Sequence, residues 1–240
     1  MLVHVMKPIA IFRHSRPEGP GYFAHYVEAK RLPWRLVRVD EGEPVPGDPH
    51  EFAGLAFMGG PMSVNDDLPW ISRTLELIRS AVATDVPVLG HCLGGQLMSK
   101  ALGGRVSSNA VKEIGWRPVR VEASMEARRW FGATTDFLSF HWHGETFTVP
   151  EGAAHLASSA HCENQAFALG KHLAMQFHVE MTPAMVRSWC DSGVGEIAAS
   201  RSSPAVQTPE EMEVDLDARA RALNAVADRL YDRWIEGLKR

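Results

Sequence analysis

One cysteine stands where a protein could present a nucleophile. Cys92 follows the apolar stretch Val86–Leu89 and precedes a helical pattern. One glycine lies two positions before it and another lies two positions after it, Gly90 and Gly94. A nucleophile on so sharp a strand-to-helix turn has a strained backbone, which requires small neighbours. The helix N-terminus would stabilise a thiolate, and the N–H of Leu93 would face a developing oxyanion. The pattern predicts a nucleophilic Cys92, the alternative being a buried structural cysteine.

A thiolate nucleophile needs a base, and the base needs an acid to orient it. Among the eleven histidines, His178 ends the apolar stretch Leu173–Phe177, at the strand end where the crevice of an open α/β sheet lies. Glu180 follows two residues later, and in an extended chain its carboxylate could accept a hydrogen bond from the imidazole. A His-x-Glu pattern alone is a weak signal. With the cysteine turn before it, it predicts a Cys-His-Glu triad.

Four motifs together resemble the class I (triad-type) glutamine amidotransferases. Residues 90–96 match the pattern G-x-C-x-G-x-Q of that family, and residues 178–180 match its H-P/V-E pattern. Residues 59–63 are similar to the G-G-P-x-S loop in the amidotransferase domain of GMP synthases, and residues 142–145 more loosely to its H-G-D segment. The resemblance covers about residues 8–183 and keeps the family's order of motifs.

The resemblance implies a role for each matched residue. Cys92 would attack the side-chain amide of glutamine, His178 would carry the thiol proton to the leaving ammonia, and Glu180 would orient His178. The backbone N–H groups of Gly60 and Leu93 would form the oxyanion hole. The amino-acid end of the substrate would contact four further residues: Gln96, Trp142, His143 and Gly144. Water would then hydrolyse the γ-glutamyl thioester. The resemblance implies no metal and no organic cofactor.

Other polar residues near these motifs invite a second interpretation. His141 and His143 could present two metal ligands on one strand face, but no third ligand is evident in the sequence, so we expect no metal. Arg13 and His14 follow the first strand and could line the crevice, although a solvated loop is the simpler expectation. Glu113 could face the pocket, or serve a surface or structural use.

Short apolar stretches alternate with helical patterns through the first hundred residues. This rhythm predicts an α/β fold, a mostly parallel open sheet flanked by helices, which the resemblance specifies as the flavodoxin-like class I glutamine amidotransferase fold. Strands are predicted at 8–12, 35–39, 54–57 and 86–89, and helices at 22–32, 70–82 and 93–102. Short strands follow at 119–121, 137–140, 146–149, 166–169 and 173–177. We expect a catalytic domain over 1–183 and a helical C-terminal extension over 184–240.

The C-terminal extension carries its own helix signals. Thr182 and Pro183 begin one helix, and residues 193–207 form a connection with room for a short helix. A capping box at 208–211 predicts one long helix, with an apolar seam spaced four and three residues apart: Leu216, Ala220, Leu223, Ala227, Leu230 and Trp234. This seam either packs on its own domain or forms a homodimer contact.

Composition excludes several classes of protein. The 240 residues carry a net charge of −4, which gives no electrostatic case for nucleic acid or a membrane surface. No apolar stretch reaches membrane-spanning length, and the N-terminus lacks the basic and small-residue features of a signal peptide. Three cysteines favour the reducing cytoplasm. Cys162 and Cys190 lack a catalytic context and are predicted to be structural.

The triad leaves the substrate beyond the γ-glutamyl group open. The protein could be a glutaminase that passes ammonia to a separate synthetase, since no P-loop or Rossmann glycine signature is present. It could instead act alone on a larger γ-glutamyl amide or peptide. A third hypothesis is a non-catalytic regulatory module, but the presence of intact Cys92, His178 and Glu180 argues against it.

Overall fold

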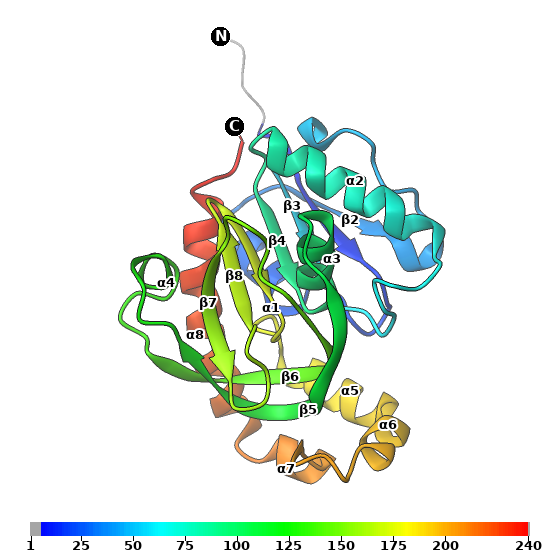
Figure 1. The fold of residues 1–240 in the computed structure, drawn as a ribbon, viewed down its shortest axis with the longest axis vertical. Coiled ribbons are helices and arrows are strands. Elements are labelled where there is room, and N and C mark those ends of the chain that lie inside the picture. The colour runs from blue at the N-terminus through cyan, green and yellow to red at the C-terminus, as the bar shows by residue number, and fades with distance from the viewer. Residues whose placement is uncertain (1–5, 240) are drawn as a thin grey trace.

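The computed structural model describes residues 6–239, which form a ten-stranded sheet with helices on both faces (Figure 1). The strands are β1 Ile9–Arg13, β2 Trp34–Arg38, β3 Gly54–Phe57, β4 Val88–His91, β5 Val106–Val121, β6 Asp136–Phe147, β7 Ala154–Ser159, β8 Ala166–Leu169, β9 His172–Met175 and β10 Ala205–Val206. The helices are α1 Gly21–Ala29, α2 Pro69–Ala83, α3 Leu93–Ala101, α4 Met125–Phe131, α5 Pro183–Ser192, α6 Val194–Ala199, α7 Pro209–Glu213 and α8 Leu216–Ile235. Two 3₁₀ turns lie at Val39–Glu41 and Pro49–Glu51.

The sheet order is β10-β5-β7-β8-β9-β4-β3-β1-β2, with β6 paired to β5. The neighbours from β2 to β9 all pair in parallel, whereas β5 to β9 are joined by antiparallel pairs. Residues 9–12, 54–57 and 88–91 are fully buried, as expected of parallel strands covered on both faces. The α/β class and open, mostly parallel sheet predicted from the sequence are confirmed.

Two hydrophobic clusters lie on opposite faces of the sheet. One includes buried residues of α2 and α3, and the other includes buried residues of α1, α4 and α8. In Figure 1, α8 runs alongside the sheet next to α4, and α5, α6 and α7 gather beyond β5 and β6 at the opposite end from α2. Between these layers, the neighbouring parallel strands β4 and β9 lead to the two key residues. Cys92 directly follows β4, and His178 lies three residues after β9.

The predicted apolar seam is buried within this chain. Leu223, Leu230 and Trp234 are at most 1% exposed and pack in the same cluster as β1 and β9. The apolar spacing is therefore explained by packing on the chain's own sheet. The division at residue 183 and the homodimer stay predictions.

The long helix with the apolar seam is present as the 20-residue α8, but the prediction that it begins at the capping box was wrong. The capping box at Thr208 is present, but α7, which it begins, ends after one turn and a half, because Val214 is extended and Asp215 has a φ of 51°. The carbonyl of Met212 accepts a hydrogen bond from the Trp116 indole at 2.9 Å, so that the chain turns at this point. The sequence pattern could not reveal this long-range bond.

Short strands predicted in the middle of the chain belong to longer ones. The stretch at 119–121 is the end of the 16-residue β5, and the stretches at 137–140 and 146–149 fall largely within the 12-residue β6. Their interiors lack clean alternation because a register shift interrupts the pairing between Ser108 and Glu113. The expected connection at 193–207 contains α6 and β10.

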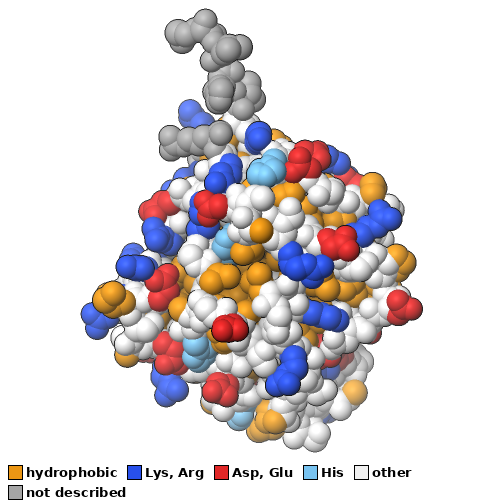
Figure 2. All heavy atoms as spheres, turned by 45° about the horizontal axis from the view of Figure 1, so that its top comes forward, with side chains coloured by type: hydrophobic (Ala, Val, Ile, Leu, Met, Phe, Trp, Pro, Cys, Tyr) orange, Lys and Arg blue, Asp and Glu red, His pale blue; other side chains and the backbone are white. Residues whose placement is uncertain are grey.

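Charge is evenly spread on the face that Figure 2 displays. Lysine, arginine, aspartate and glutamate side chains are interspersed there, with hydrophobic side chains between them. Among residues 6–239, no helix is both long and apolar enough to span a membrane. The first five residues, for which we expected no signal peptide, lie outside the described part of the chain.

Gly94 offers a test of how tightly the catalytic turn is packed. A Cβ added there would lie 2.1 Å from the carbonyl oxygen of Phe57, whereas a Cβ on Gly195 would meet nothing within 4 Å. We expect Gly94→Ala to lower the free energy of unfolding by about 2–3 kcal/mol. Gly195→Ala, within α6, should raise it by up to about 1 kcal/mol. Urea denaturation of both variants checks this, and equal stabilities would contradict the packing argument.

Candidate active site

Cys92 occupies the turn between β4 and α3 in a strained backbone conformation. Its φ is 49° and its ψ is −106°, values that a non-glycine residue rarely adopts. A Cβ on Gly90 would lie 2.5 Å from the carbonyl carbon of Gly94, and a Cβ on Gly95 would lie 2.6 Å from the carbonyl oxygen of Met175. The turn therefore closes only with glycines beside the cysteine, and it directs the thiol toward the crevice.

The thiol has polar neighbours on two sides. The side-chain amide of Gln176 donates to Sγ of Cys92 at 3.4 Å, and the Gln96 amide donates to Oε1 of Gln176 at 3.1 Å. Sγ also lies 3.9 Å from the carbonyl oxygen of Trp142. An N–H donor at the sulfur stabilises the thiolate form. Gln176 was not predicted from the sequence, although it lies two residues before His178.

His178 and Glu180 form a buried pair. Nδ1 of His178 lies 2.7 Å from Oε1 of Glu180, and both residues are at most 2% exposed. The His178 backbone N–H donates to the carbonyl of Phe140 at 2.9 Å, and the Trp189 ring meets the imidazole edge-on at 4.9 Å. These contacts fix the imidazole, whose Nε2 has no hydrogen-bond partner among residues 6–239.

Charge decides the protonation state of this pair. Burial works to lower the pKa of His178, but the Glu180 carboxylate and the Cys92 sulfur outweigh it, and the pKa rises well above its usual value. Burial works to raise the pKa of Glu180, but the facing imidazoles of His178 and His91 lower it. The geometry therefore favours an imidazolium beside a carboxylate.

The C-terminal helix α8 reaches this pair through a second histidine. Nε2 of His91 lies 3.0 Å from the hydroxyl oxygen of Tyr231 and 3.8 Å from Oε2 of Glu180. His91 is fully buried, and burial lowers its pKa. Neither His91 nor Tyr231 was singled out in the sequence, because no local pattern reports a contact across 140 residues.

The proposed oxyanion residues lie against each other. A Cβ on Gly60 would fall 2.7 Å from a side-chain carbon of Leu93, and neither backbone N–H donates to another group within the described residues. His14 lies beneath this loop, with Nδ1 3.0 Å from the carbonyl oxygen of Met58. It is 2% exposed and stacks on Trp70, so the solvated loop expected there was wrong for His14. Burial lowers its pKa to about 4, so it is neutral.

A cavity of about 490 Å³ opens over the thiol. Six of the residues predicted from the sequence line it: Gly60, Cys92, Gln96, Trp142, His143 and Gly144. Arg13 does not, because its guanidinium is paired with Asp40 and Glu41 at 3.0 and 2.7 Å. The structure thus brings these six residues together from the loop after β3, the β4–α3 turn, α3 and β6, whereas Leu93, His178 and Glu180 do not line the cavity.

Comparison with known proteins identifies the family. The Glutamine amidotransferase class-I family matches residues 22–187, which include Cys92, His178 and Glu180. This chain belongs to that family. A crystal structure of a glutamine amido transferase from Methylobacillus flagellatus superposes with a TM-score of 0.96 at 43% identity, covering 98% of this chain and 97% of that one. The resemblance indicated by the motifs is confirmed.

Three characterised or named proteins are also similar in sequence to this amidotransferase. The glutamine amidotransferase-like protein YfeJ of Salmonella typhimurium is 29% identical over 83% of this chain and 86% of its own. Gamma-glutamyl peptidase 3 of Arabidopsis thaliana is 30% identical over 67% of this chain and 69% of its own. The glutamine-hydrolysing GMP synthase of Bacillus subtilis is 33% identical over 53% of this chain, which corresponds to 24% of that protein.

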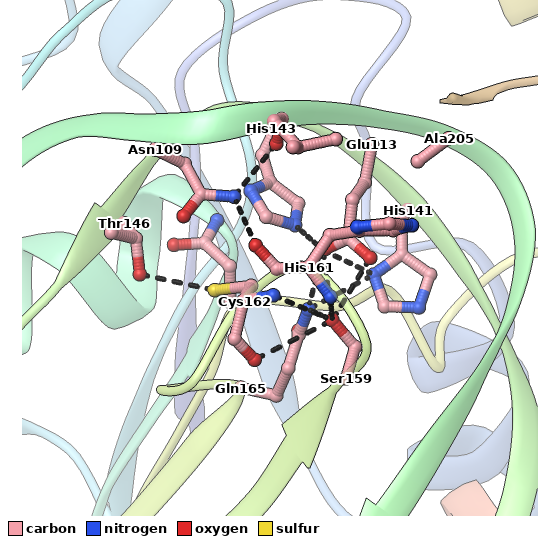
Figure 3. Close-up of polar contacts among 12 residues, drawn as sticks. Asn109, Glu113, His141, His143, Thr146, Ser159, His161, Cys162, Gln165 and Ala205 are labelled. Carbon is pink, nitrogen blue, oxygen red and sulfur yellow. Dashed lines mark hydrogen bonds and ion pairs between the residues drawn. The ribbon is translucent and has the colours of Figure 1, made fainter. Parts of the chain in front are cut away.

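A buried polar cluster lies beside the cavity of this amidotransferase (Figure 3). Glu113 on β5 faces His141 and His143 on β6, with carboxylate-to-nitrogen distances of 3.9 and 3.1 Å. Its carboxylate also accepts hydrogen bonds from the Ser159 hydroxyl at 2.9 Å and the Gln165 amide at 2.8 Å. Burial works to raise the pKa of Glu113, but these partners lower it. Glu113 is therefore an ionised, buried residue that holds β6 beside the pocket.

The same cluster has the ligand types of a zinc site. One nitrogen from each histidine and a carboxylate oxygen lie within 4.8 Å of one another. Glu113 is thus the third candidate ligand that the sequence did not reveal. However, Nε2 of Gln165 lies 2.8 Å from Oε2 of Glu113 and 3.4 Å from Nδ1 of His141, so an ion would have to displace this amide. Hydrogen bonds account for the cluster better than an ion does.

Removing the Glu113 carboxylate should destabilise the protein. In Glu113→Ala, the buried donors of Ser159 and Gln165 lose their shared acceptor and His143 loses the facing carboxylate, and we expect the free energy of unfolding to fall by about 3 kcal/mol or more. The exposed Glu28→Ala on α1 is the control and should stay within about 0.5 kcal/mol of wild type. Chemical denaturation measures both. Thermal stability should also survive dialysis against a chelator, and a fall would favour the metal interpretation.

Proposed function

We propose that this chain hydrolyses the side-chain amide of glutamine through a γ-glutamyl thioester on Cys92 and releases ammonia. The observation that carries the proposal is the constellation around the thiol. Cys92, at the N-terminus of α3 and with a strained backbone, lines a cavity. The buried pair of His178 and Glu180, 2.7 Å apart, belongs to the same part of the molecule. Membership of the glutamine amidotransferase class-I family supports the same chemistry.

The reaction can be followed atom by atom. With the thiol proton on Nε2 of His178, as an imidazolium beside Glu180, the Cys92 sulfur attacks the γ-carbonyl carbon of the substrate. The negative charge that develops on the carbonyl oxygen is stabilised by the backbone N–H groups of Gly60 and Leu93. When the tetrahedral species collapses, the C–N bond breaks and His178 gives its proton to the leaving amine. Water, deprotonated by His178, then attacks the thioester, and glutamate leaves as the thiol reforms.

Each buried group has a place in this cycle. Glu180 accepts from Nδ1 of His178, which keeps Nε2 directed at the sulfur and stabilises the imidazolium. Gln176 donates to the sulfur and thereby favours the thiolate. Gln96, Trp142, His143 and Gly144 are proposed to contact the amino-acid end of the substrate, because all four line the cavity next to Cys92.

A larger γ-glutamyl amide or peptide is the second candidate substrate. Beyond the residues proposed to bind the γ-glutamyl group, the cavity is also lined by Trp189, Ser192 and Glu196, which could contact a larger leaving group. Similarity to gamma-glutamyl peptidase 3 extends over 69% of that protein. In the glutaminase alternative, a separate synthetase would accept the ammonia, as the 24% coverage of GMP synthase leaves most of that protein without a counterpart here.

Labelling by a glutamine-like electrophile tests the nucleophile. Wild type should gain one covalent label at Cys92, detected by intact mass and peptide mapping, and Cys92→Ala should gain none. Cys162→Ala and Cys190→Ala are matched controls that should label as wild type does. Burial raises the pKa of each of these two thiols to about 11, so they carry little thiolate. Unchanged labelling of Cys92→Ala would overturn the assignment.

Loss of the base should abolish turnover without unfolding the protein. We expect His178→Asn to reduce kcat for amide hydrolysis by about three orders of magnitude or more. The exposed His25→Asn on α1 is the control. Ammonia or amine release from glutamine and a panel of γ-glutamyl amides gives the rates, and circular dichroism checks the fold. Near-wild-type turnover in His178→Asn would exclude the proposed base.

A further inference from the structure

Glu18 places a carboxylate beside the catalytic imidazole. It lies in the loop between β1 and α1 and lines the cavity over Cys92. A Cβ built on Gly59 would fall 2.3 Å from Oε2 of Glu18 and 3.1 Å from Cε1 of His178. The carboxylate and the imidazole therefore flank the same point of the backbone, next to the proposed oxyanion residue Gly60.

Glu18 differs from the other carboxylates that line the cavity. Glu145 accepts a hydrogen bond from the Ser63 hydroxyl at 3.0 Å. Glu196 is paired with the Lys112 ammonium and also accepts from the Trp142 indole at 2.8 Å. The Glu18 side chain has no hydrogen-bond or ion-pair partner in the described part of the chain, so it faces the cavity without compensation.

The loop that carries Glu18 is held at both ends. The Trp189 indole donates to the carbonyl of Pro17 at 2.8 Å, and the Tyr22 N–H donates to the carbonyl of Glu180 at 2.8 Å. Trp189 is the same residue that packs against His178. The backbone on both sides of Glu18 is thus held by Trp189 and by the carbonyl of Glu180, unlike that of a mobile surface loop.

The position of Glu18 corresponds to the leaving-group side of the reaction. His178 must hand its proton to the departing amine, so that amine lies close to the imidazole. The residues proposed for the amino-acid end of the substrate, such as Gln96 and His143, come from α3 and β6, whereas Oε2 of Glu18 and Cε1 of His178 both lie close to Gly59. A substituent on the leaving nitrogen would therefore meet the Glu18 carboxylate.

We propose that Glu18 forms a leaving-group subsite that selects γ-glutamyl amides whose amine part carries a further positive charge. This inference rests on the proposed hydrolysis at Cys92. A short diamine fits best, because Oε2 of Glu18 and the imidazole lie on either side of one backbone atom, so the cation must be only a few bonds from the scissile nitrogen. A charge-assisted hydrogen bond would hold it.

The charge of Glu18 depends on pH near neutrality. Burial, with smaller contributions from Glu180 and Glu196, raises its pKa to about 7, although the facing His178 imidazolium works to lower it. Because the pKa is raised, the carboxyl is neutral below about pH 7 and becomes a carboxylate above it. Preference for a cationic amine should therefore grow as the pH increases from 6 to 8.

Two isosteric substrates test the inference. The γ-glutamyl amide of 1,2-diaminoethane ends in an ammonium group, whereas that of n-propylamine ends in a methyl group. In wild type, the ratio of kcat/KM for the first to that for the second should be about ten or more at pH 8 and should decrease toward pH 6. In Glu18→Gln, the ratio should fall about tenfold at pH 8 and lose its pH dependence. Glu28→Gln is the exposed control and should keep the wild-type ratio.

The outcomes separate this inference from the proposed function. Labelling of Cys92 together with a ratio that Glu18→Gln does not change would overturn the subsite and leave the hydrolase assignment in place. Absence of labelling and of hydrolysis in wild type would overturn both. A fall of the kcat/KM ratio in Glu18→Gln, together with loss of its pH dependence, would support the subsite. A purely structural role for Glu18 would instead lower kcat/KM for both substrates and leave their ratio unchanged.

Discussion

The close approach of three backbone segments at the β4–α3 turn is the constraint on which the site depends. Gly94 lies so near the Phe57 carbonyl, and Gly95 so near that of Met175, that neither position has room for a side chain. This contact fixes α3 against β3 and β9. As a result Cys92 is held at a φ of 49°, its thiol is presented at the strand ends, and the first N–H groups of α3 remain free. A looser turn would relax the backbone and withdraw the thiol from the crevice.

The second consequence of this packing is that the chain leaving β9 places His178, the proposed base, at the same edge of the sheet as Cys92. The Cys92 N–H donates to the carbonyl of Met175 at 2.8 Å, three residues before His178. A chain of buried groups then runs from His178 through Glu180 and His91 to Tyr231 on α8. The C-terminal helix is therefore part of the support of the catalytic pair, and its apolar seam provides the burial that this chain of contacts requires.

How much of this was predictable depends on whether the signal is local. The alternation of apolar stretches with helical patterns is a local signal and predicted the fold class, and the short motifs around Cys92 and His178 led to the residues that line the cavity. Contacts between distant segments leave no such trace. Gln176 and Tyr231 act across more than eighty residues, and the bond from Trp116 that coincides with the end of α7 spans 96 residues. His14 was expected in a solvated loop because its stacking on Trp70 is a tertiary contact that no local pattern reveals.

Partners distinguish three glutamates near the pocket. Glu113 and Glu180 are buried and Glu18 is partly buried, and burial by itself raises the pKa of a carboxyl group. Glu180 has an imidazole at 2.7 Å, and Glu113 has a hydroxyl, an amide and an imidazole, so both remain ionised and serve to hold other groups in place. Glu18 has no such donor, and its pKa stays near 7. A partly buried carboxylate without a donor is less favourable than one in water, and in the proposed subsite the cation of the substrate would supply the missing partner.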